Sequence, residues 1–198
     1  MRPKNLEKEE AIRTTALQII AEEGLENLSM QKLAKAAGIS PRTIYIKYEN
    51  KEDLLVKLYI EAVLDNYEKA VLENFKPEMD FATGVKKLWT NGFKYLSNNR
   101  PHFSLIQYGK SSPQLNMAYA NAKIKEGQYF VPIHHFLRRH VANGTITDFP
   151  SEVHRALLFS PLLDLVTEYF DYQVRPQQII TEKLLAACAE AVIKGMLK

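Results

Sequence analysis

Basic and hydroxyl side chains are concentrated in one short stretch of the chain, residues 28–51. This stretch carries five positive charges against one negative charge. Cations mixed with hydroxyls suit phosphate oxygens, and an arginine can also bind a guanine edge through two parallel hydrogen bonds. The chemistry indicated is therefore contact with a nucleic-acid duplex. The five cations are Lys32, Lys35, Arg42, Lys47 and Lys51.

Two short helices joined by a tight turn are expected to position these side chains. Ser29 can cap a helix over residues 30–37, and Gly38 can end it where a positive φ is needed. Ser40 and Pro41 then begin a second helix. This pattern predicts a helix-turn-helix whose second helix enters the DNA major groove. The alternative is an ordinary helical hairpin. The apolar residues that can pack between the helices are Leu33, Ala34, Ala37, Ile39 and Ile44.

The pattern also assigns roles to individual side chains. Arg42 is expected to read bases, and Lys51, at the start of the following helix, to bind a phosphate. Gln31, Thr43, Tyr45 and Lys47 are expected to hold phosphates as well. The full predicted DNA-binding set is Ser29, Gln31, Lys32, Ser40, Pro41, Arg42, Thr43, Tyr45, Lys47, Tyr48 and Lys51.

The segments LAKAAGIS and TIYIKYENKEDLL resemble the signature of the TetR (tetracycline-repressor) family of transcriptional regulators. The resemblance covers roughly the first third of the chain. Two residues depart from the family pattern: Tyr48 stands where phenylalanine is usual, and Lys47 where histidine or an aromatic residue is frequent. The matching positions are Ala34, Gly38, Ser40, Thr43, Ile44, Tyr45, Tyr48, Lys51, Glu52 and Asp53.

The resemblance implies an all-α protein of about nine helices. A three-helix DNA-binding domain would occupy residues 1–50, with the signature continuing to about residue 65, and a helical effector-binding and dimerisation domain would occupy residues 51–198. The function implied is a sequence-specific transcriptional regulator, usually a repressor, that a small molecule releases from its operator.

Composition agrees with a globular protein. The 198 residues are 46% hydrophobic and 25% charged, with a net charge of +3. The single cysteine, Cys188, leaves no internal disulfide, and no signal peptide or membrane-spanning run is found, so a cytoplasmic location is expected. No nucleophile elbow, P-loop, dinucleotide fingerprint or metal-ligand spacing occurs. We therefore expect no enzyme activity, no cofactor and no metal, although His134, His135 and His140 lie close in sequence.

Apolar periodicity predicts further helices and no strand. Residues 1–7 are expected to be a frayed tail or, alternatively, a basic arm on DNA that uses Arg2 and Lys4. Residues 101–108 are expected to form a short segment and 109–113 a loop. The predicted helices outside the helix-turn-helix span residues 7–23, 51–75, 80–98, 113–141, 151–172 (kinked by Pro161) and 176–196.

The last two helices are the candidate dimer interface. Paired with their symmetry mates they would form a four-helix bundle, and Ala186, Ala187 and Ala191 would allow close approach. The alternative is that these faces complete the core of a monomer. Since one recognition helix covers few base pairs, a homodimer through residues 151–196 on a palindromic operator is expected.

Aromatic residues in the middle of the chain suggest a pocket for a small apolar or aromatic effector. Gly84 and Gly92 inside a predicted helix could leave space for that ligand or allow close helix packing. The candidate ligand-binding residues are Trp89, Phe93, His102, Phe103, Gln107, Tyr119, Tyr129 and His134. Two other functions remain open: a DNA-binding regulator controlled by a protein partner, and a small helical enzyme or carrier.

Overall fold

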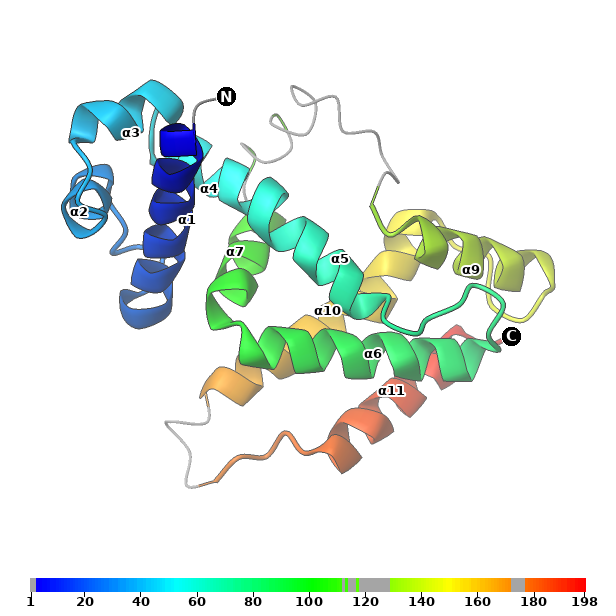
Figure 1. Cartoon of the computed structure of the whole chain (residues 1–198). Helices are drawn as coiled ribbons and strands as arrows, with labels where there is room; N and C mark the ends of the chain where they lie inside the picture. Colours follow the sequence, from blue (N-terminus) through cyan, green and yellow to red (C-terminus); the bar gives the residue numbers. More distant parts are fainter. Residues whose placement is uncertain (1–2, 112, 114–116, 118–128, 172–176) are drawn as a thin grey trace. The chain divides into compact units, whose positions relative to one another are not determined.

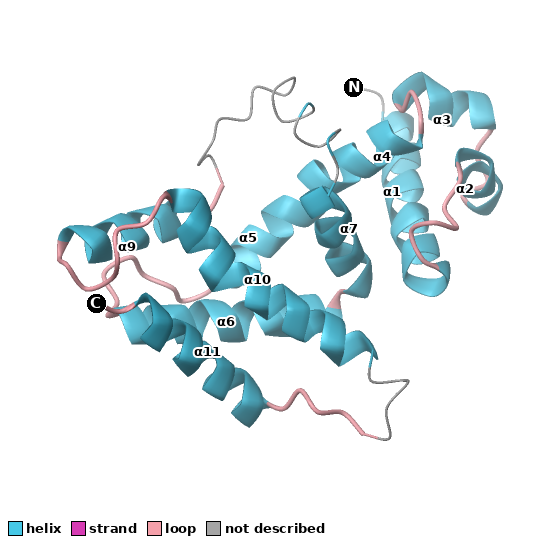
Figure 2. Cartoon of the chain, turned by 180° about the vertical axis from the view of Figure 1, so that it is seen from behind, coloured by secondary structure: helices cyan, strands magenta, loops and turns pink. Residues whose placement is uncertain are grey.

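The computed structural model describes residues 3–111, 113, 117, 129–171 and 177–198. Across these ranges the regular elements are helices and the only strand-like feature is an isolated antiparallel bridge between Ile146 and Leu197, which confirms the all-α prediction. No described helix has an apolar stretch that could cross a bilayer. The elements, shown in Figures 1 and 2, are α1 (Pro3–Glu23), α2 (Met30–Ala36), α3 (Pro41–Lys47), α4 (Lys51–Leu58), the π-helix η1 (Tyr59–Leu64), α5 (Asp65–Val71), α6 (Phe81–Asn98), α7 (Arg100–Ser111), α9 (Val131–Ala142), α10 (Ser151–Phe170) and α11 (Glu182–Met196).

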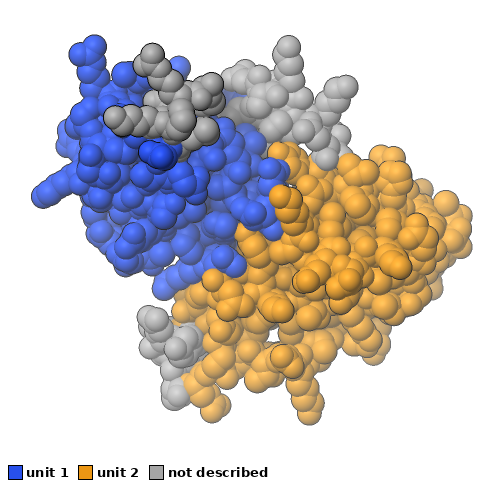
Figure 3. Space-filling model, in the orientation of Figure 1, with its two compact units in different colours: residues 1–66, 99–125 blue, residues 67–98, 126–198 orange. Residues whose placement is uncertain are grey.

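The chain divides into two compact units, which Figure 3 colours separately. Unit 1 comprises Met1–Asn66 and Asn99–Lys125, and unit 2 comprises Tyr67–Asn98 and Glu126–Lys198. Each unit therefore contains two stretches that are distant in the sequence. The domain boundary predicted at residue 50 stays a prediction.

The core of unit 1 is built where α1 contacts α2 and α7, and where α7 contacts η1. Ile12, Ala16 and Ile20 of α1 are buried as expected from their spacing, whereas Leu17 is half-buried. The helix begins at Pro3 rather than at residue 7, so the predicted tail is helical from that point on. Proline is well tolerated in a first helical turn, because its missing N–H would have no partner there.

A continuous helical run from Lys51 to Val71 connects the two units along the chain. The apolar pattern predicts an end at residue 75, but Asn74 has a φ of 56°, which ends the helix earlier. Its middle third, η1, is π-helical. No residue type in the sequence signals this widening, and π segments of this kind recur at functional sites.

The core of unit 2 forms where α6 packs against both α10 and α11. Val85, Leu88 and Trp89 of α6 are buried. The Trp89 indole N–H donates a 2.9 Å hydrogen bond to the Leu158 carbonyl of α10. This bond satisfies the one polar atom of a large buried side chain, so Trp89 packs as part of the hydrophobic core.

Three predicted segments differ from the structure. The short segment 101–108 and most of the loop 109–113 form one helix, α7, because Pro101 lies in its first turn and therefore starts the helix. Within the predicted helix 113–141, α9 begins at Val131, after Phe130, which adopts a left-handed conformation with φ of 57°; most of residues 112–128 lie outside the described part. The last helix begins at Glu182, where the Thr181 hydroxyl accepts a hydrogen bond from the Leu184 N–H at 3.2 Å.

Candidate functional site

The turn between α2 and α3 has the local geometry that the sequence predicts. The Ser29 hydroxyl accepts from the Lys32 N–H at 3.2 Å, and the Ser40 hydroxyl accepts from the Thr43 N–H at the same distance. Gly38 has a φ of 63°, a conformation that side chains with a Cβ rarely adopt. Both helices are therefore capped by their own side chains, and the turn between them is fixed.

Buried contacts hold α3 in place. Ile44 is fully buried, as is Leu33 of α2, and Ala34 is 2% exposed, which allows the two helices to approach closely. Since α3 has only seven residues, packing rather than intrinsic helix stability must determine its position.

The opposite face of α3 is open. Pro41 and Arg42 are exposed, Tyr45 is 48% exposed and Ile46 is 79% exposed. Arg42 has no ion pair within the described part of the chain, and the same is true of the exposed Lys35 on α2. These two cations are therefore available to an anionic partner without breaking an existing ion pair.

The other three cations of the predicted set already have partners. Lys32 pairs with Glu23, Lys47 pairs with Glu9, and Lys51 Nζ lies 3.3 Å from the Glu26 carbonyl oxygen. The hydrogen bond from Lys47 is the main reason that the pKa of Glu9 lies below its ordinary value. A phosphate must compete with these partners, which a count of charges along the sequence does not reveal. Of the remaining predicted residues, Gln31 is exposed, while the Ser29 and Ser40 hydroxyls serve as caps.

Tyr48 lies in the core, where it is 1% exposed. Its hydroxyl is hydrogen-bonded to Arg13 of α1, and burial raises the pKa of this hydroxyl. Arg13 also pairs with Glu9 at 2.8 Å and with Glu61 of η1. Tyr48 therefore anchors the end of α3 and offers no surface to DNA, whereas the predicted set includes it as a DNA-binding residue.

Ile46 is absent from the predicted set, yet it is the most exposed large apolar side chain among the described residues. Helical spacing could have located it, because Ile44 and Tyr48 are four residues apart and both point inward, which turns the residues between them outward.

Comparison with known proteins agrees with this geometry. The model of the tetR family of bacterial regulatory proteins matches residues 12–58, which contain the whole helix-turn-helix. An uncharacterised HTH-type transcriptional regulator of Haemophilus influenzae is 24% identical over 196 residues, covering 98% of this chain and 100% of that protein. Residues 12–58 of this chain are therefore similar to the N-terminal region of the tetR family of bacterial regulatory proteins.

Further relatives cover part of the chain or share its fold. The fatty acid metabolism regulator protein of Bacillus subtilis is 32% identical over 89 residues, which are 43% of this chain and 44% of that protein. A TetR-family transcriptional regulator from Haemophilus influenzae has the same fold, with a TM-score of 0.74 at 22% identity over 100% of both chains. A Bacillus subtilis transcriptional regulator, solved in complex with stearoyl-CoA, gives a TM-score of 0.64 at 20% identity over 95% of this chain and 97% of that one.

The effector-binding residues predicted from the sequence are distributed over both units. Trp89, Phe93, Tyr129 and His134 belong to unit 2, whereas His102, Phe103 and Gln107 belong to unit 1; Tyr119 lies outside the described residues. Trp89 and Phe103 are buried, and the Phe93 ring packs edge-on against Tyr169 with the ring centroids 5.4 Å apart. Burial lowers the pKa of His102.

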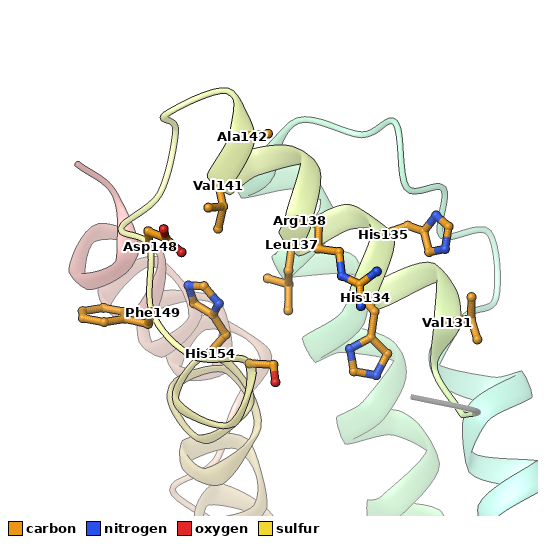
Figure 4. Close-up of a pocket in the computed structure, with 11 residues that line it drawn as sticks. Val131, His134, His135, Leu137, Arg138, Val141, Ala142, Asp148, Phe149 and His154 are labelled. Atoms are coloured by element: carbon orange, nitrogen blue, oxygen red, sulfur yellow. The ribbon is translucent and has the colours of Figure 1, made fainter. Parts of the chain in front are cut away.

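A cavity of about 600 Å³ lies in unit 2, bordered by α9, the following loop and the start of α10 (Figure 4). His134, from the predicted set, is one of its lining residues. His154, another lining residue, is 4% exposed, and its Nε2–H donates to the Thr147 carbonyl at 2.8 Å. Its polar lining is His134, His135, Arg138, Asp148, Ser151 and His154, and its apolar lining is Val131, Leu137, Val141, Ala142 and Phe149. The described residues contain no group of His, Cys, Asp and Glu able to hold a metal ion.

Proposed function

We propose that this chain is a sequence-specific transcriptional repressor of the TetR family that binds its operator as a homodimer and is released by a small-molecule effector. The observation that carries the proposal is the face of α3: Ile44 and Tyr48 fix the helix from inside, while Arg42 is exposed and unpaired within the described residues. A helix held rigidly with its polar face open suits the major groove. We place the activity in the cytoplasm, because bacterial operators are there.

A second copy of the chain is the expected partner of α10 and α11. Val153, Leu157 and Leu184 are between 38% and 39% exposed in the single chain, and Ala187 and Ala191 are exposed as well. These side chains do not complete the core of one subunit, so they favour pairing with the same helices of a second. Two recognition helices would then reach half-sites about 34–36 Å apart.

Acyl thioesters are the first effector class to test. A relative that matches 43% of this chain is named as a fatty acid metabolism regulator protein, and a protein of the same fold was solved in complex with stearoyl-CoA. Val131, Leu137 and Phe149 line the cavity in unit 2 and offer apolar contacts to an acyl chain. An effector can release DNA only if it binds one conformation better than the other.

Selection of bound duplexes from a random pool tests the proposal most directly. We expect a palindromic site, bound with a strong dependence on salt concentration. Stearoyl-CoA should then lower the affinity for that duplex, measured by fluorescence anisotropy. Enrichment of no sequence, together with turnover of an acyl-CoA, would favour the enzyme or carrier instead.

Regulation by a protein partner predicts a different outcome. The palindromic site would still be selected, but no compound in a thermal-shift panel that includes acyl-CoA esters would raise the melting temperature. The two modes of regulation are thereby separated without knowledge of the regulated genes.

A further inference from the structure

Ile46 stands out on the surface of unit 1. Its side chain is 79% exposed, whereas Ile44, two residues earlier, is fully buried. A branched aliphatic side chain left in water gains nothing for the stability of the fold. No described residue covers it, so its burial must come from outside the single chain or not at all.

The position of Ile46 on α3 limits what could cover it. Arg42 and Ile46 are four residues apart and therefore share one face of the helix, with Tyr45 beside them. The face is narrow and carries a guanidinium with no ion pair among the described residues. A stable protein interface needs about 800 Å² from each partner, with an apolar centre larger than one side chain. A DNA groove, by contrast, accepts single side chains.

In the major groove the apolar group at a base edge is the 5-methyl of thymine. We propose that Ile46 determines specificity by packing against a thymine methyl in each half-site, a proposal that rests on the proposed DNA binding. Four residues of α-helix rise about 6 Å, and successive base pairs of one strand are about 3.4 Å apart. The thymine therefore lies about two base pairs from the base that Arg42 contacts.

Deoxyuridine provides the matched test, because it differs from thymidine by that methyl alone. Each thymidine of the selected duplex is replaced singly, and affinity is measured by fluorescence anisotropy. Burying one methyl group changes an equilibrium constant about fourfold. The affinity of wild type should therefore fall about fourfold when the thymidine at one position of a half-site is replaced. It should fall about fifteenfold when the symmetric thymidine of the other half-site is replaced as well.

Variants identify the side chain responsible. Ile46→Ala should bind thymidine and deoxyuridine duplexes equally at that position, and Ile46→Val should keep most of the difference. Lys35→Ala is the control: it should weaken binding to every duplex and leave the deoxyuridine penalty unchanged. Because Ile46 is 79% exposed, Ile46→Ala should unfold at the wild-type temperature.

The outcomes separate the inference from the proposed function. If no duplex is selected, the proposed function fails, and this inference with it. If a duplex is selected but replacing none of its thymidines with deoxyuridine lowers the affinity, or if wild type and Ile46→Ala show the same deoxyuridine penalty, the role of Ile46 is refuted while DNA binding stands.

Discussion

Replacing Gly84 with alanine decides between the two reasons that the sequence offers for a glycine inside α6. A Cβ at this position would lie 2.5 Å from both Cε2 and Cζ of Phe136, well inside van der Waals contact. The Phe136 ring is fully buried and stacks on Phe81 with the ring centroids 5.7 Å apart. The ring has little room to move, so close packing rather than ligand space explains this glycine.

The expected loss of stability follows from two opposing effects. Overpacking of a buried site costs about 1–3 kcal/mol, and with a ring held by neighbours we expect the upper half of that range. Alanine gains about 1 kcal/mol over glycine in a helix interior. Gly84→Ala should therefore lower the free energy of unfolding by about 1–2 kcal/mol.

Urea unfolding at fixed protein concentration measures this change, with the fluorescence of Trp89, the single tryptophan, as the probe. Gly195→Ala in α11 is the control, because no described atom beyond its chain neighbours and the nearby backbone of its own helix lies within 4 Å of the added Cβ. It should raise stability by up to about 1 kcal/mol. A Gly84→Ala protein at least as stable as wild type would refute the packing argument, and weaker stearoyl-CoA binding in that protein would then favour the ligand-space explanation.

Three further predictions concern charged and titrating groups. Arg42→Ala should weaken binding to the selected duplex by about 1–3 kcal/mol per half-site and leave the melting temperature unchanged; anisotropy and thermal unfolding check both. Lys51→Ala should weaken binding to all duplexes. It should also reduce the slope of log affinity against log salt concentration by about 0.9 for each phosphate that the variant no longer neutralises. An unchanged slope would mean that Lys51 donates its hydrogen bond to the Glu26 carbonyl and contacts no phosphate. Burial holds the pKa of His140 below its ordinary value of 6.5, so the free energy of unfolding of wild type should decrease as the pH falls below 6.5. Urea unfolding at pH 7.5 and 5.5 should show a smaller decrease for His140→Gln than for wild type.

Local signals in the sequence predict the helix-turn-helix well. Ser29, Ser40 and Gly38 act within three or four residues of themselves, through one hydrogen bond or one backbone conformation each. Such features depend on nothing distant in the chain. The family resemblance rests on the same stretch, which is why the family model matches there.

Features that the residue types do not signal locally, or that depend on distant residues, could not be predicted in the same way. The start of α9 depends on the left-handed backbone of Phe130, a residue whose type gives no such signal. The start of α11 is hidden in the sequence because Ile179 and Ile180 continue the apolar pattern ahead of the true cap, Thr181. The sequence shows that a glycine at position 84 is unusual inside a helix, but only the contact with Phe136 explains why a side chain does not fit there.

The ion pairs around α3 also depend on residues distant in the sequence, and they give its basic side chains different roles. Counting cations by sequence treats Lys47 and Arg42 as equivalent. In the structure Lys47 pairs with Glu9, and Glu9 also binds Arg13, which holds the buried Tyr48. Lys47 therefore takes part in fixing α3 before any DNA is present, while Arg42 remains available to bind it. Because a seven-residue helix has little stability alone, this division agrees with the proposed function: Lys47 would help to hold α3 rigid so that Arg42 could bind the duplex.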